Sequence, residues 1–387
     1  MISRFLRSNK WFTRNVILTI LGSSIFASGY VFTFQGTNNL IGKNLGLDFV
    51  APLVLWLYIV GECSTIISGV LIRRYNAKVV TQTAVICMAL GAWACAHATY
   101  SLLTMAAAYA LYSAAHFAAF TAIATICRMS MPAEVNQQRR GGSVYGGASY
   151  ILASLSGYAI PLVMTSVGVW ERVSIGISLP ILLILWFVKL PENMQPSTEY
   201  SLTVRGFARE LFDFGSLRVV WPHSVIIVAN TILLIFLPLT AGTDAGTLLF
   251  WYFLTCGVAG IFFPILIAER KSDWLSSQCS FLFAGSSMVL LFFGGGNYLL
   301  NLSAVILLGL SIGLSRVATS QLGADDAQLS GRGVSTFYSA GIKFGQLIGS
   351  ALGLLRPWLG DWFWWTPIPL LVAAFVYMTI QKRQRNC

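Results

Sequence analysis

Twelve apolar segments, most of them about twenty residues long, account for most of this chain of 387 residues. A helix needs roughly 20 apolar residues to cross a bilayer, and only helices and closed barrels satisfy their backbone hydrogen bonds there. We therefore predict an all-α membrane protein with spans at 14–36, 49–72, 79–97, 101–127, 142–165, 172–190, 221–242, 247–268, 278–295, 298–318, 333–355 and 362–380.

Composition and motifs favour the same class. Only 10% of the residues are charged, against about 25% in soluble domains. The seven cysteines show no CxxC or Cys/His ligand spacing, so we expect neither a disulfide framework nor a metal site. The Walker, HExxH and dinucleotide motifs are also missing, and there is no GxSxG elbow, since the one match, Gly309-Leu310-Ser311-Ile312-Gly313, lies inside an apolar span. We therefore predict no enzyme activity and no cofactor.

Basic residues predict the orientation, because cytoplasmic loops of membrane proteins carry an excess of Lys and Arg. With the N-terminus inside, the external loops keep only Lys43, Arg172 and Arg356 of the 25 basic residues, and Lys343 lies within a span. This predicts a multi-pass protein of a bacterial-type inner membrane with both termini cytoplasmic. The net charge of +11 then reflects topology and not nucleic-acid binding.

The spans divide into two six-helix halves, 1–190 and 221–387, joined by a polar cytoplasmic linker at 191–220 with an interfacial helix. Arg140-Gly141-Gly142-Ser143 opens the fifth span, and Arg332-Gly333-Val334-Ser335 opens the eleventh, 192 residues later. Two halves repeated in the same orientation are typical of one large class of transporters.

With these features the chain resembles the major facilitator superfamily over essentially its whole length. The family's loop motif, Gly-x-x-x-Asp-Arg/Lys-x-Gly-Arg/Lys-Arg/Lys, is partly kept between Gly69 and Lys78, with Arg73 in place of the Asp. The family's Asp caps the eleventh helix and latches the halves, so Arg73 implies a weaker latch or a contact with Asp325 or Asp326. The resemblance implies a cytoplasmic gate formed by Gly69, Arg73, Arg74, Lys78, Glu269, Arg270, Asp325, Asp326 and Arg332.

Two ionisable residues, Glu62 and Lys343, lie in the middle of apolar spans. Glu62 precedes Arg73 by eleven residues and Lys343 follows Arg332 by eleven, so each lies about 16 Å from the cytoplasmic surface. The resemblance makes the second and eleventh helices neighbours, and we predict a contact between the two charges. It is either a static salt bridge or a pair that breaks and re-forms while Glu62 takes a proton.

His116, in the fourth span, is either a buried hydrogen-bonded side chain or a substrate contact and proton relay. Neutral side chains could complete an aromatic-rich cavity for a small molecule, although each alone is more often a packing residue. These candidates are Gln35, Tyr30, Tyr112, Asn230, Trp251, Tyr252 and Gln346. Gly341, Gly345, Gly349 and Gly353 give the eleventh span a smooth face suited to sliding contact.

We predict a monomeric secondary transporter that uses protons to export a small organic compound, drug-like or a secreted metabolite such as a siderophore. The family's drug/proton antiporters usually carry a Gly-Pro pair in the fifth span, which this chain lacks. That absence leaves proton-coupled uptake of a nutrient as the alternative. A membrane sensor without transport activity is a third possibility.

Overall fold

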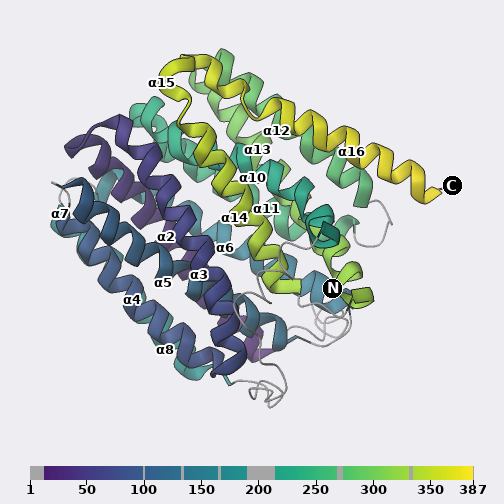
Figure 1. The fold of residues 1–387 in the computed structure, drawn as a ribbon, viewed down its shortest axis with the longest axis horizontal. Helices are drawn as coiled ribbons and strands as arrows, with labels where there is room; N and C mark the ends of the chain where they lie inside the picture. The colour runs from purple at the N-terminus through teal and green to yellow at the C-terminus, as the bar shows by residue number, and fades with distance from the viewer. Residues whose placement is uncertain are drawn as a thin grey trace.

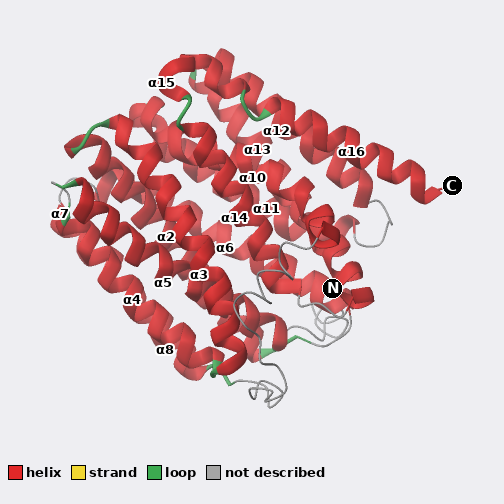
Figure 2. Ribbon diagram, viewed as in Figure 1, coloured by secondary structure: helices red, strands yellow, loops and turns green. Residues whose placement is uncertain are grey.

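The computed structural model describes residues 13–98, 101–131, 135–163, 167–189, 214–267, 273–330 and 334–386. Nearly all of these residues are helical, and the described ranges contain no strand (Figure 2). The described part of the chain includes nine helices that are long and apolar enough to cross a membrane. The prediction of an all-α, multi-pass membrane protein is confirmed.

The first half contains the predicted spans, but the helix of the first span continues to Asn44, beyond the predicted end at 36, and the helix of the fifth begins at Val135, before the predicted start at 142. The predicted sixth span, 172–190, is divided into two short helices that meet at Ile177. The helices of this half are α2 (Arg14–Asn44), η1 (Leu47–Phe49), α3 (Val50–Arg74), α4 (Ala77–His97), α5 (Leu102–Met129), α6 (Val135–Val163), α7 (Val167–Gly176) and α8 (Ser178–Phe187).

The second half repeats the pattern. Its tenth span continues to Ser330, beyond the predicted end at 318, so Asp325 and Asp326 belong to that helix and not to a loop before the eleventh span. The helices are α10 (Phe214–Thr240), η3 (Gly242–Asp244), α11 (Ala245–Ile267), α12 (Asp273–Gly294), α13 (Tyr298–Ser330), α14 (Val334–Gly353), α15 (Arg356–Leu359), η4 (Gly360–Trp365) and α16 (Ile368–Asn386).

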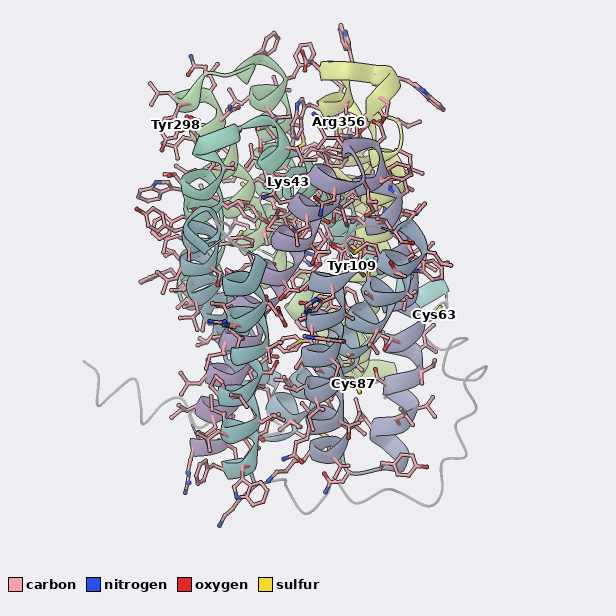
Figure 3. All side chains as sticks on the ribbon, turned by 90° about the vertical axis from the view of Figure 1, so that its left-hand side faces the viewer. Lys43, Cys63, Cys87, Tyr109, Tyr298 and Arg356 are labelled. Carbon is pink, nitrogen blue, oxygen red and sulfur yellow. The ribbon has the colours of Figure 1, made fainter. Side chains whose placement is uncertain are left out.

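The helices run side by side between two ends of the bundle (Figure 1). We call the end where α2 begins and α16 finishes the terminal face, and the end with α7 and α15 the distal face. Lys43, Tyr298 and Arg356 lie toward the distal face (Figure 3). At the terminal face, Asn15 Nδ2 donates to Lys189 O over 2.5 Å and Lys189 N donates to Asn15 Oδ1 over 3.2 Å. The first and last helices of the first half therefore begin and end together.

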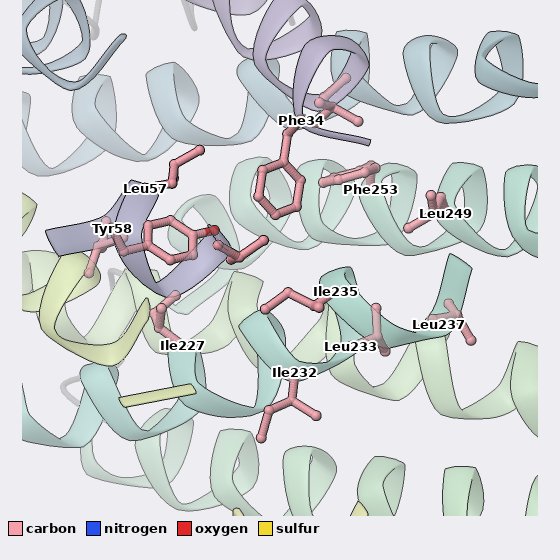
Figure 4. Packing of buried hydrophobic residues seen from close by; sticks show 14 of the residues in the cluster. Phe34, Leu57, Tyr58, Ile227, Ile232, Leu233, Ile235, Leu237, Leu249 and Phe253 are labelled. Carbon is pink, nitrogen blue, oxygen red and sulfur yellow. The ribbon is translucent and has the colours of Figure 1, made fainter. Parts of the chain in front are cut away.

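Several helix pairs join the halves: α6 packs against α11 and α13, α14 against α3 and α5, and α2 against α10. One continuous apolar cluster fills the space between them. Phe34 and Tyr58 from the first half lie near Ile227, Ile235 and Phe253 from the second half (Figure 4). The described core thus belongs to both halves together.

Candidate functional site

Glu62 is the buried carboxylic acid among the described residues of the first half. It lies on α3, twelve residues from Val50 at one end and twelve from Arg74 at the other, and is only 8% exposed. A charge at this depth of a bilayer costs several kcal/mol unless it is paired or neutralised by a proton. The helix that carries it packs against α14 of the other half.

Lys343 lies at the matching depth of α14, nine residues after Val334 and ten before Gly353. Its side chain lies outside the described part of the structure. The backbone places the two helices side by side, as the predicted contact requires. The Glu62–Lys343 contact itself stays a prediction.

A pair of tyrosine hydroxyls links α3 to α2, one helical turn from Glu62. Tyr58 precedes Glu62 by four residues, so both side chains lie on the same side of α3. The Tyr58 hydroxyl is 3.0 Å from the hydroxyl of Tyr30 on α2. The Tyr30 ring also stacks on His116, so Tyr30 contacts both Tyr58 and His116.

His116 is enclosed by aromatic rings and is 4% exposed. Its imidazole stacks on Phe26 with ring centroids 4.4 Å apart and on Tyr30 with centroids 4.3 Å apart. Tyr112, one helical turn earlier on α5, stacks at 5.9 Å. The faces of aromatic rings carry negative charge, so this enclosure can accept the imidazole in its neutral or its protonated form.

The candidate cavity residues of the second half are in different environments. Tyr252 is fully buried and its hydroxyl donates to Asn230 Oδ1 of α10. Trp251, the preceding residue, is 40% exposed and meets Phe250 edge to face. Gln346 is partly buried, and its backbone carbonyl oxygen accepts from the Ser350 hydroxyl. Neighbouring positions of a helix point about 100° apart, so Trp251 and Tyr252 do not share one surface.

Gln35 makes a contact between the halves. Its Nε2 donates to the backbone carbonyl of Leu234 on α10 over 2.9 Å. Gln35 is 5% exposed. Gln35 was predicted to line a cavity. In the structure its amide nitrogen bonds to the other half.

Glycines bring two helices of opposite halves close together. A methyl group on Gly147 of α6 would lie 2.8 Å from the carbonyl oxygen of Gly257 on α11, and one on Gly257 would lie 2.8 Å from that of Gly147. No ordinary side chain fits at such distances, so the two backbones touch. On α14, in contrast, methyl groups on Gly345 and Gly349 would strike α10 of the same half. Gly345 and Gly349 of the predicted sliding face are therefore packed inside one half, whereas Gly353 lies against both Phe236 of α10 and Ala51 of α3.

The predicted gate is only partly described. Gly69 is buried in α3. Lys78 Nζ donates to the carbonyls of Trp186 at 2.9 Å and Val188 at 3.2 Å, so it holds the end of α8 within the first half. The side chains of Arg73, Arg74, Asp325 and Asp326 and the whole of Glu269, Arg270 and Arg332 lie outside the described residues.

Comparison with solved structures settles the fold. The chain superimposes on the human organic anion transporter MFSD10 (TETRAN) with a TM-score of 0.72, covering 94% of this chain and 99% of that one, at 12% sequence identity. The chain has the major facilitator fold. Neither a protein-family model nor a curated protein sequence matches it.

Within this fold, two features of the centre were not predicted from the sequence. The Tyr58 hydroxyl contacts Tyr30, and the spacing of four between Tyr58 and Glu62 was the available signal. The sequence signal for the contact between Gly147 and Gly257 was weaker, because it consisted only of their location in spans rich in small residues. Neither signal names the partner helix, which only the packing of the two halves reveals.

Proposed function

We propose that this protein is a secondary transporter that exports a small organic compound in exchange for protons by alternating access. The observation that carries the proposal is the buried carboxyl of Glu62, at mid-depth on a helix that packs against the other half. The major facilitator fold supports transport as the general activity. The lack of an ATP-binding motif in the sequence points to an ion gradient as the source of energy.

The proposed coupling follows from the cost of burying charge. When α3 and α14 are packed together, the Glu62 carboxylate is neutralised by the Lys343 ammonium or by a proton. When the halves separate toward one side of the membrane, water reaches the carboxyl, and it equilibrates with the protons on that side. Export in exchange for protons requires Glu62 to gain its proton from outside and to release it inside.

His116 is proposed as a second proton-carrying group. Its ordinary pKa lies near neutral pH, and its ring lies beside Tyr30, whose hydroxyl bonds to Tyr58. The Tyr58–Tyr30 pair therefore contacts His116 at one end, and its other end, Tyr58, lies one helical turn from Glu62 on α3. Hydroxyl groups both donate and accept hydrogen bonds, so the pair can relay a proton without carrying charge itself.

The proposed substrate is a small organic molecule that binds between the halves in a monomeric transporter. The similar human protein is an organic anion transporter by name, which supports an organic substrate. The distribution of Lys and Arg in the sequence supports a cytoplasmic terminal face and an external distal face.

The test is accumulation of a panel of radiolabelled organic anions, cations and neutral compounds in cells with and without the protein, at external pH 6 and 8. We expect the protein to lower accumulation of at least one compound, more strongly at external pH 6. Glu62→Gln should abolish this dependence on pH with the protein still present in the membrane. If Glu62→Gln keeps the wild-type pH dependence, coupling through this carboxyl is refuted.

Proton-coupled uptake of a nutrient is the second candidate, favoured by the lack of a Gly-Pro pair in the fifth span. It predicts that the protein raises accumulation in the same assay. A membrane sensor would change accumulation in neither direction.

A further inference from the structure

The contact between Gln35 and Leu234 involves a carbonyl that its own helix leaves without the usual donor. In an α-helix, the carbonyl of residue 234 accepts from the N–H of residue 238. Residue 238 is a proline within α10, and proline has no N–H. The Leu234 carbonyl is therefore available to another donor, and Gln35 Nε2 supplies it from 2.9 Å.

The bond crosses from one half to the other in the distal part of the bundle. Gln35 lies nine residues before the distal end of α2 at Asn44, and Leu234 lies six residues before the distal end of α10 at Thr240. The neighbouring core is apolar, with Phe34 and Ile235 both buried. A polar contact in such surroundings is stronger than in water and costly to leave unmade.

A second contact shows that the distal ends are closed together in this structure. A methyl group on Gly353, at the distal end of α14, would lie 3.6 Å from the Cβ atom of Ala51 on α3. The α2–α10 and α3–α14 pairs thus both meet at this end. The Gln35–Leu234 bond is a polar member of the contact between the halves at this end.

We propose that Gln35, Leu234 and Pro238 form a latch that holds the distal face closed. The proline leaves a carbonyl vacant on α10, and the glutamine of α2 fills it only while the halves are together. On distal opening the bond breaks, and water that enters the gap solvates both the amide and the carbonyl. The latch rests on the proposed function, because it presumes that the two halves separate at this end.

The shared carbonyl makes the latch testable by removing either partner. Gln35→Leu removes the donor at similar volume. Pro238→Ala restores an N–H that donates to Leu234 within α10 and competes with Gln35. Pro222→Ala is the matched control, because Pro222 lies in the same helix but toward the terminal face.

The measurement is the distance between spin labels at the distal ends of α2 and α10, on a chain whose native cysteines have been replaced. Asn44→Cys and Thr240→Cys provide exposed attachment sites at these ends. Pulsed electron–electron double resonance on the protein in nanodiscs gives the distribution of distances between the two labels. The short and long distances give the fractions of closed and open molecules in the absence of substrate. We expect Gln35→Leu to raise the open-to-closed ratio about fivefold, as loss of one hydrogen bond should.

Pro238→Ala should raise the ratio in the same direction, and Gln35→Leu should add nothing in the Pro238→Ala background. Pro222→Ala should leave the ratio unchanged. If Pro238→Ala fails to fold, Gln35→Asn provides the second variant, since its shorter amide cannot reach the carbonyl and should act like Gln35→Leu.

An unchanged distance distribution in Gln35→Leu would overturn the latch. So would a Gln35→Leu effect of equal size with and without Pro238. The distance measurement tests the latch, and the accumulation assay tests the proposed function, so the two can be refuted independently. Shifted distances without any transport refute the proposed function alone, and transport with unshifted distances refutes the latch alone.

Discussion

The α3–α14 and α6–α11 contacts both join the two halves, but the residues that form them differ in kind. The first carries Glu62 at mid-depth, with Lys343 at the matching level of the partner helix. The second carries Gly147 and Gly257, whose backbones touch. One pair of helices carries ionisable residues that can change charge, and the other carries glycines, which have no side chains.

The difference suggests a division of labour. A contact between ionisable side chains responds to protons and can be made or broken by them. A contact between glycine backbones has no such response, but it allows two helices to turn against each other at close range. In the proposed mechanism α3–α14 senses the proton, and α6–α11 stays packed as the halves rock.

The largest expected effect is at α6–α11. Gly257→Ala would place a methyl group 2.8 Å from the carbonyl of Gly147 and 2.8 Å from Ile151 N. Backbone atoms of α6 can move away from the new methyl group only if the whole helix shifts. We therefore expect a loss of about 3 kcal/mol of stability, the upper part of the range for overpacking. Denaturation by SDS measures this loss.

Gly142→Ala is the control for that variant. It lies on α6, and a methyl group there meets no atom of the described residues within 4 Å. It should be as stable as the wild type or slightly more so, since alanine favours helix over glycine. Equal destabilisation by both variants would show that the close backbone contact does not matter.

The next effect is at α3–α14. Glu62→Gln keeps the shape of the side chain but cannot ionise, so we expect proton-driven transport to fall about tenfold, within the usual range of coupling between sites. Counterflow of substrate without a pH gradient should be retained. Loss of counterflow as well would mean that Glu62 is needed for packing or binding rather than for coupling.

Lys343→Met sharpens the same comparison. If the predicted pair exists, removing one charge leaves the other buried and unpaired, and combining Glu62→Gln with Lys343→Met should recover part of the stability lost in the single variant. Independent, additive losses of stability would place the two side chains apart.

A smaller effect is expected from Tyr58→Phe. It removes one hydroxyl of the 3.0 Å pair with Tyr30, which should cost about 1 kcal/mol of stability, the usual net value of a hydrogen bond. If the pair also relays protons, the pH dependence of transport should flatten. The same change at Tyr109, which instead bonds to Asn38, should cost similar stability and leave the pH dependence intact.

The smallest effect is expected outside both contacts. Lys78→Met removes a cation from the end of α8, where it bonds to the Trp186 and Val188 carbonyls, and should cost about 0.3–1 kcal/mol. Transport should be unchanged, because this contact lies within the first half. A marked loss of transport in a stable variant would instead support the predicted role of Lys78 in the cytoplasmic gate.

The sequence predicted the fold well because bilayer thickness sets the length of an apolar span. It did not predict the division of the sixth span at Ile177, because residues 173–188 on both sides of the division carry no charge and form one largely apolar run. The sequence also did not show which residues of different helices contact one another. Gln35 was expected at a cavity and bonds to Leu234, and the described glycines of α14 pack on α10. Such pairings depend on how each helix is rotated about its axis, which length and hydropathy leave open.

The reciprocal hydrogen bonds between Asn15 and Lys189 have a consequence for biosynthesis. They tie the beginning of the first six-helix unit to its conclusion, so the ring of helices can close only after its last member leaves the ribosome. Until α8 has been synthesised, α2 lies in the membrane without one of its partner helices. A chain cut between the two units should consequently yield fragments that each assemble and then recombine when they are synthesised together.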